Sequence, residues 1–168
     1  KLPVICLGFL LVQVASFTAK AAPRPSTVLL ITSEELADAW SDFANWKTAE
    51  GKPTKIVTIA ELTKDIEGDD IQQKIRSAVL RSIDIEDTHW VILGGDSLPD
   101  GKGHVPDRDT RHRAFRYADI PTDIYYLSRR DYDANDDGIY GDWDDDRTEV
   151  EYTHPHAVIG RIPVRTPG

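Results

Sequence analysis

The chain has 168 residues and a formal net charge of −9 at pH 7, with 29 acidic and 20 basic side chains. This length suffices for one domain with a hydrophobic core. The acidic balance argues against nucleic acid as a partner, because phosphate backbones are bound by clustered lysine and arginine. Cys6 is the single cysteine, so the sequence offers no pair for an internal disulfide.

Residues 2–17 form an almost wholly apolar run between Lys1 and the A-x-A triplet at residues 19–21. This order is typical of a secretory signal peptide, and the run is short for a membrane span. We expect cleavage of residues 1–21 to release residues 22–168 as a secreted or cell-surface protein without a membrane segment; a retained anchor is the alternative. Loss of Lys1 and Lys20 would take the charge from −9 to −11 and leave no cysteine.

Four apolar runs predict strands that are buried on both faces of a sheet: residues 27–32, 55–59, 89–94 and 157–162. Helical spacing of apolar residues predicts one helix from Ser33, as N-cap, to Gly51 and a second over residues 69–84. Alternating strands and helices indicate an α/β fold with a mostly parallel sheet flanked by helices. The long segment before the last strand predicts only a short edge strand, at residues 124–127.

Gly94-Gly95-Asp96 directly follows the third predicted strand. Ligands of open α/β sheets lie beyond the carboxyl ends of the strands, so Asp96 is a candidate for an active cleft. A tight turn explains the same three residues equally well. The mixed-charge run at residues 107–113 is typical of solvated surface, with a substrate site as the alternative. No nucleotide-binding glycine motif or G-x-S-x-G elbow occurs.

The most specific motif lies in the Asp-rich stretch 131–146. Asp133, Asn135 and Asp137 stand at alternate positions and Gly138 follows, which matches the D-x-[DN]-x-[DN]-G pattern of calcium loops. Calcium prefers six to eight oxygen ligands, and three short side chains at this spacing can converge if glycine lets the chain turn sharply. The flanking residues lack a helical pattern, so we expect a loop held inside another fold rather than a full EF-hand.

By the standard spacing, the carbonyl of Ile139 would be a further ligand, and Asp144 would stand at the last position with Asp142 as a substitute. A solvated acidic loop is the alternative, because the stretch carries many like charges. The sequence predicts a structural calcium ion with these ligands: Asp133, Asn135, Asp137, Ile139, Asp142 and Asp144.

Six segments, in this order and spacing, resemble the gingipain-type cysteine peptidases. They are V-L-L-I-T-S-E-E-L-A-D-A-W (28–40), W-K-T-A-E-G-K-P-T-K-I-V-T (46–58), W-V-I-L-G-G-D (90–96), D-I-Y-Y-L (123–127), D-A-N-D-D-G-I-Y-G (133–141) and A-V-I-G-R-I-P-V-R-T (157–166).

The resemblance implies a caspase-like three-layer α/β sandwich, structural calcium, and a secreted cysteine endopeptidase that acts on protein or peptide substrates. It also implies that residues 22–168 are the N-terminal part of the peptidase domain, truncated at the C-terminal end. The catalytic His and Cys of this family follow the G-R-I-P-V-R strand, so no catalytic residue is assigned here, and we expect the segment alone to be inactive.

Two related functions stay open from the sequence: a non-catalytic secreted calcium-binding domain, and a sortase-like transpeptidase of the same family. A flavodoxin-like binding domain also fits the alternation of strands and helices, but the leader and the acidic loop argue against it. Such sheets host many functions, so fold analogy alone does not choose among them.

Overall fold

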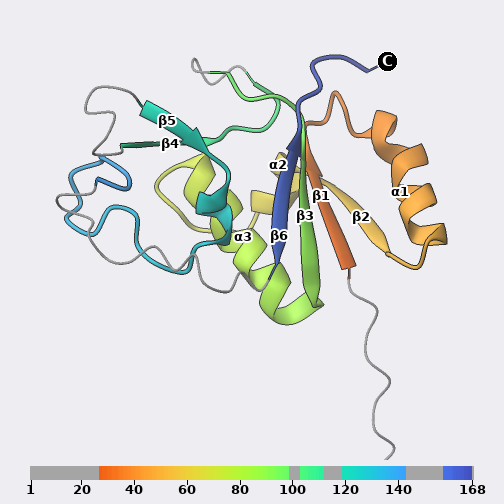
Figure 1. The fold of residues 1–168 in the computed structure, drawn as a ribbon, viewed down its shortest axis with the longest axis horizontal. Helices are drawn as coiled ribbons and strands as arrows, with labels where there is room; N and C mark the ends of the chain where they lie inside the picture. Colours follow the sequence, from red (N-terminus) through yellow and green to blue (C-terminus); the bar gives the residue numbers. More distant parts are fainter. Residues whose placement is uncertain (1–26, 99–102, 112–118, 143–156, 168) are drawn as a thin grey trace, which may run out of the picture.

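The computed structural model describes residues 27–98, 103–111, 119–142 and 157–167. Its centre is a four-stranded parallel sheet in the order β2-β1-β3-β6 (Figure 1). The strands are β1 Thr27–Thr32, β2 Thr54–Thr58, β3 Thr88–Gly94 and β6 Val158–Ile162. All four lie within one residue of the positions that the apolar runs predict.

Helices cover both faces of this sheet, which confirms the predicted α/β sandwich. The longer helices are α1 Ser41–Ala49 on one face and α3 Ile71–Glu86 on the other, with the short α2 Ile59–Thr63 beside α3. Two 3-10 helices, η1 Asp38–Trp40 and η3 Ile124–Leu127, and an antiparallel strand pair, β4 Arg108–Arg111 with β5 Asp119–Thr122, complete the described elements. No helix among the described residues is long and apolar enough to cross a membrane.

Alternate residues of β1 supply the two halves of the core, because successive side chains of a strand point to opposite faces. Leu29 and Ile31 belong to the cluster that contains α3 residues such as Val79. Leu30 packs instead with Leu36 and Trp40 on the α1 face. The continuous burial of β1 is therefore the pattern of a central parallel strand.

The side-chain capping of α2 and α3 follows local sequence signals. Asp70 is the N-cap of α3 and accepts a hydrogen bond from the amide of Gln73 at 2.7 Å. Thr58 and Glu61 form a capping box that begins α2 directly after β2. The predicted strand 55–59 therefore runs one residue too far, because the T-x-x-E pattern at its end starts a helix.

Two local predictions are wrong. Ser33 does not cap the first helix: turns and η1 precede α1, and the Ser33 hydroxyl lies 2.8 Å from Nδ1 of His104. Residues 124–127 form η3 rather than an edge strand. Tyr125 and Tyr126 are both fully buried in one core cluster, whereas a strand would direct two adjacent side chains to opposite faces.

Candidate functional site

The carboxyl ends of β1, β3 and β6 lie side by side, since Thr32 pairs with Gly94 and Gly94 with Ile162. The hydroxyl of Thr32 donates to the Gly94 carbonyl at 2.5 Å and accepts from Nε1 of Trp40 at 3.2 Å. A Cβ at Gly94 would lie 2.7 Å from the Trp40 ring, so this position requires glycine. The indole thus closes one side of the sheet edge at which α/β proteins place their ligands.

Asp96 lies at this edge, as the sequence predicts, and it joins the segments that follow β3 and β6. Its residue is 6% exposed, its amide donates to the carbonyl of Val164, and its carboxylate accepts from Nε of Arg165 at 2.7 Å. The amide of His104 also donates to this carboxylate. The side chain is therefore engaged in holding two loops together.

Burial by itself raises the pKa of Asp96, but the hydrogen bonds from Arg165 and from the His104 amide outweigh it, so the net pKa is below its ordinary value of 3.8. A carboxyl group with a depressed pKa stabilises the folded state at neutral pH and loses this effect as the pH falls through the folded-state pKa.

We expect Asp96→Asn to lower the melting temperature by a constant amount above about pH 5, with the difference from the parent shrinking below about pH 4. The parent loses the charge interaction in acid, whereas the variant lacks it throughout. Thermal unfolding of both proteins across this pH range measures the effect. A difference that stays constant down to about pH 2 would contradict the role of the ionised carboxylate.

His104 bridges the ends of β1 and β6. Its Nδ1 contacts the Ser33 hydroxyl, and its Nε2 lies 2.8 Å from the carbonyl of Arg165. Because a carbonyl only accepts, Nε2 carries a proton, and in the neutral ring Nδ1 accepts from Ser33. Both ring nitrogens are thus engaged. The sequence assigns His104 no catalytic role, and this geometry gives none either.

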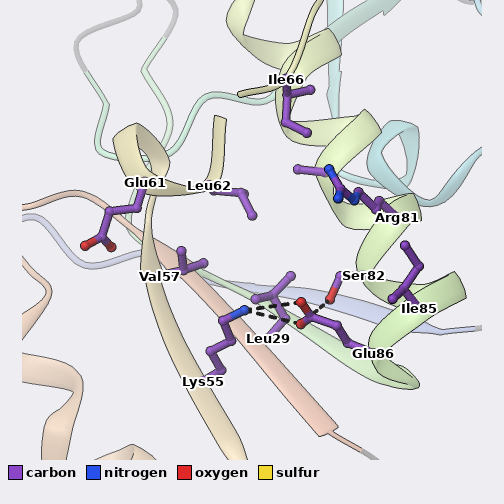
Figure 2. A pocket seen from close by; sticks show the side chains of 11 residues that line it. Leu29, Lys55, Val57, Glu61, Leu62, Ile66, Arg81, Ser82, Ile85 and Glu86 are labelled. Atoms are coloured by element: carbon purple, nitrogen blue, oxygen red, sulfur yellow. Dashed lines mark hydrogen bonds and ion pairs between the residues drawn. The ribbon is translucent and has the colours of Figure 1, made fainter. Parts of the chain in front are cut away.

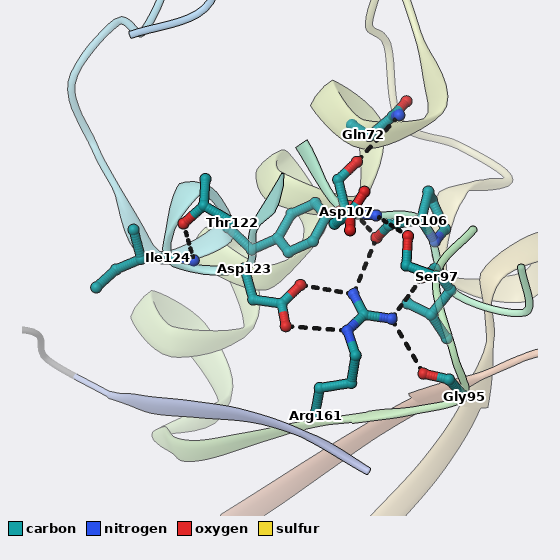
Figure 3. Close-up of polar contacts among 11 residues, drawn as sticks. Gln72, Gly95, Ser97, Pro106, Asp107, Thr122, Asp123, Ile124 and Arg161 are labelled. Atoms are coloured by element: carbon teal, nitrogen blue, oxygen red, sulfur yellow. Dashed lines mark hydrogen bonds and ion pairs between the residues drawn. The ribbon is translucent and has the colours of Figure 1, made fainter. Parts of the chain in front are cut away.

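Arg161 of β6 is the centre of a polar network at this edge (Figure 3). Its Nε and Nη2 donate to the two carboxylate oxygens of Asp123 at 3.0 and 2.5 Å. Its remaining donors reach the carbonyls of Gly95, Val105 and Pro106. One guanidinium therefore ties the segment after β3 and the start of η3 to β6.

The predicted calcium loop is curled around the side chains of its motif. The carboxylate of Asp133 accepts from the amides of Asp137 at 2.9 Å and Gly138 at 3.0 Å. The Asn135 side chain accepts from the same Asp137 amide and donates to the Asp137 carboxylate. Gly138 has φ of +78°, which permits the sharp turn. These hydrogen bonds connect Asp133, Asn135 and Asp137 within one turn.

The remaining predicted ligands are arranged differently. The amide of Ile139 donates to Asp137 at 2.8 Å, so this residue adjoins the three motif side chains. The carboxylate of Asp142 lies 3.9 Å from Nη1 of Arg111. Asp144 lies outside the described residues. Within the described ranges, no group of three or more His, Cys, Asp or Glu side chains is placed to hold a metal ion.

Two tyrosines anchor both ends of this loop in the core. Tyr132 and Tyr140 pack edge-to-face on the buried Tyr125, with ring centroids 5.3 and 6.0 Å away. The amide of Gly141 donates to the Tyr132 carbonyl, and the amide of Arg111 donates to the Tyr140 carbonyl. The loop is therefore part of the packed domain, although the flanking helices of an EF-hand are absent from the described residues around it.

Arg108 lies beneath the loop and is only 7% exposed. Its guanidinium is 3.8 Å from the Tyr140 ring centroid and 4.7 Å from that of Tyr125, and Nη2 donates to both carboxylate oxygens of Asp70. Burial lowers the pKa of Arg108, but the bond to Asp70 and the neighbouring groups raise it to a net value above the ordinary one. The prediction that residues 107–113 are solvated surface is therefore wrong for Arg108.

A pocket of about 250 Å³ lies between β1, β2, α2 and α3 (Figure 2). Its wall mixes apolar side chains such as Leu29, Val57 and Leu62 with charged ones, and the Lys55–Glu86 ion pair crosses one end. No histidine or cysteine is among the residues that line it. Its chemistry offers packing space rather than a catalytic group.

The chain is an α/β protein, and its fold is similar to that of a solved protease. The chain superimposes on a structure titled "Structure of Protease" with a TM-score of 0.52 and 14% identity, over 87% of this chain and 26% of that chain. This likeness concerns the fold alone, and the chain spans about a quarter of that protease's length.

The family model of peptidase family C25 matches residues 21–168. The chain belongs to this family, the gingipain family of cysteine peptidases, which confirms the resemblance seen in the sequence. No curated protein matches the chain.

Proposed function

We propose that the chain is the N-terminal part of the catalytic domain of a secreted, calcium-stabilised cysteine endopeptidase. The observation that carries the proposal is the family match, which covers the whole segment after the expected signal peptide. The likeness to about a quarter of a longer protease fits the same interpretation. The catalytic Cys and His belong, in this proposal, to the polypeptide that follows residue 168.

The expected reaction is peptide-bond hydrolysis by a thiolate. A histidine maintains the cysteine as thiolate, the thiolate attacks the peptide carbonyl, and backbone amides stabilise the oxyanion before water releases the acyl-enzyme. None of these groups is assigned to a residue of this chain. Its contribution is a rigid sheet edge, at which Arg161 and Asp96 fix the loops that surround the carboxyl ends of the strands.

Calcium would stabilise the loop by neutralising its carboxylates. Asp133, Asn135 and Asp137 supply the oxygen atoms that a hard cation prefers, with Ile139 adjacent and Asp142 and Asp144 as further proposed ligands. Because Tyr132 and Tyr140 connect the loop to the core, ordering the loop would stabilise the whole domain.

Millimolar calcium is expected to raise the melting temperature of the full-length protein, with about 2.7 kcal/mol of stabilisation at a hundredfold excess over Kd. The Asp133→Ala/Asp137→Ala variant should lose this response. Asp136→Asn is the matched control, because Asp136 is exposed, has φ of +58° that Asn tolerates, and is not a motif ligand. Equal calcium responses in the parent and the double variant would refute the site.

The peptidase itself is tested with the full-length protein and an unstructured protein substrate. We expect cleavage that iodoacetamide abolishes, since the nucleophile is a thiolate. Adding a small amine such as glycine amide separates the two reactions of the family: a product joined to the amine indicates a transpeptidase, and free carboxyl ends indicate hydrolysis. No cleavage and no transfer under reducing conditions with calcium would instead support the non-catalytic calcium-binding domain.

A further inference from the structure

Exposed apolar side chains lie on one face of the sheet, over the neighbouring strands β3 and β6. Parallel sheets normally have both faces covered. Yet Trp90 of β3, a strand with neighbours on both sides, is 40% exposed. In the adjacent strand β6, Val158 is 53% and Ile162 36% exposed. Large apolar residues on adjacent strands of one sheet are the kind of surface that marks an interaction site.

These side chains lie on the same face. Trp90 pairs with Val158, and the register continues at every second residue along both strands. Alternate residues of paired strands share a face, so the exposed set lies opposite Val91 and Leu93, which pack toward α3. We call this surface the β3–β6 face; it consists of Trp90, Val158, Gly160 and Ile162. Ile92 lies at its margin and is partly buried against the cluster of Leu30, Leu36 and Trp40.

Space above this face is open in the described part of the chain. A Cβ added at Gly160 would meet no atom within 4 Å. Lys52 provides partial cover, because its ammonium lies 5.2 Å from the Trp90 ring centroid, but the ring remains 40% exposed. The face is thus apolar, with one cation at its margin.

The strand order explains why none of the described connections covers this face. The connection from β1 to β2 carries α1 on one face, and the connection from β2 to β3 runs the opposite way and carries α3 on the other (Figure 1). β6 lies on the far side of β3 from β1, and for a connection in this direction the rule of right-handed crossovers favours the α3 face for its described part. Tyr125 and Tyr126 of η3 pack there.

We propose that the β3–β6 face is the docking surface for the remaining part of the peptidase polypeptide, an inference that rests on the proposed function. The chain matches 26% of the length of the solved protease, so a much larger part of such a protein is available as the occupant. After β6, Val164 packs against the cluster of Leu30 and Trp40, so the chain leaves the sheet on the α1 face. The polypeptide that follows thus starts beside the uncovered surface.

Thiol labelling of the full-length protein tests this proposal. Val158→Cys and Ile85→Cys place a thiol at two apolar positions that are similarly exposed here, at 53% and 61%. Val158 lies on the β3–β6 face, whereas Ile85 belongs to α3, the helix that covers the other face of the sheet. The labelling of the unmodified parent is subtracted from both variants. Because the docked polypeptide would cover residue 158, Val158→Cys is expected to react with a maleimide at least about tenfold more slowly than Ile85→Cys. Equal labelling rates in the two folded variants would overturn the proposal. Protection of Val158→Cys that disappears when the protein is diluted would also overturn it, because that result indicates that a second copy of the protein covers the face.

A second measurement identifies the occupant. A site for a sequence-specific protease is inserted after Gly168 of the full-length protein, and the two halves are expected to co-elute after cleavage. Gly160→Asp should separate them, whereas Ile85→Asp should not. Halves that separate without any substitution, or that stay together equally in both variants, would overturn the proposal. Neither measurement depends on enzymatic activity. A protein whose halves stay together but which cleaves no substrate would therefore refute the proposed peptidase activity and leave the proposed docking surface standing.

Discussion

Arg161→Met is expected to lower the free energy of unfolding by about 3–5 kcal/mol, the usual cost of breaking a buried ion pair from one side. The side chain of Arg161 is 15% exposed and that of Asp123 is 23% exposed. Removing the guanidinium leaves the Asp123 carboxylate without Arg161 and takes the Arg161 donor from the carbonyls of Gly95 and Val105. The Pro106 carbonyl also loses Arg161 but still accepts from the Tyr126 hydroxyl. Urea unfolding followed by tryptophan fluorescence measures the loss.

Arg129→Met is the matched control, because Arg129 forms a comparable pair with Asp84 whose side chains are 42% and 52% exposed. Exposed pairs contribute little, so the control should cost less than about 1 kcal/mol. Arg161→Lys should fall between the two, since lysine retains the charge but not the planar fork of donors. Similar losses for Arg161→Met and Arg129→Met would contradict the clamp at the sheet edge.

Asp70→Ala is expected to destabilise the protein by a similar amount, about 3–5 kcal/mol, because it leaves the buried Arg108 guanidinium unpaired. The same substitution also removes the N-cap of α3. Asp69→Ala, one residue earlier, should change stability by less than about 0.5 kcal/mol, since its side chain is exposed.

The double variant Asp70→Asn/Arg108→Met separates the two roles of Asp70. Asparagine retains the capping oxygen, and methionine replaces the buried charge with an apolar chain of similar length. We expect this double variant to be more stable than Asp70→Ala. If Asp70→Ala unfolds at the same urea concentration as Asp69→Ala, the buried ion pair has no stabilising role.

The sheet could be predicted from the sequence because its signals are local. The run T-V-L-L-I-T predicts a strand at 27–32, where β1 lies, and burial on both faces leaves no polar residue to interrupt it. The periodicity of α3 is equally local, and it ends at Glu86, two residues beyond the prediction, where Asp87 adopts a left-handed conformation. The alternation of strands and helices then indicates the parallel arrangement.

The polar networks could not be predicted, because their partners are distant in the sequence. Arg108 and Asp70 are separated by 38 positions, as are Arg161 and Asp123, and no local pattern links either pair. An arginine inside the apolar strand V-I-G-R-I is a signal that such a pair exists. Its partner becomes visible only when η3 is packed against the sheet.

The calcium motif could be predicted from the sequence only in part. Its first three side chains are close in sequence, and the structure brings Asp133, Asn135 and Asp137 together around the Asp137 amide. The end of the motif depends on the segment after Asp142, where Asp144 lies outside the described residues. Short-range spacing thus predicts the turn, and the full ligand set stays a prediction that calcium titration tests.

Active-site mapping of the full-length protein tests the central claim most directly. The protein is treated with an alkylating peptidyl inhibitor in calcium-containing buffer, and the modified residue is located by mass spectrometry. We predict one modified cysteine, located after residue 168, with modification and peptide cleavage lost together when that cysteine is replaced by alanine. Cleavage that persists after the replacement, or a full-length protein that has no reactive cysteine, would contradict a thiol peptidase built on this sheet.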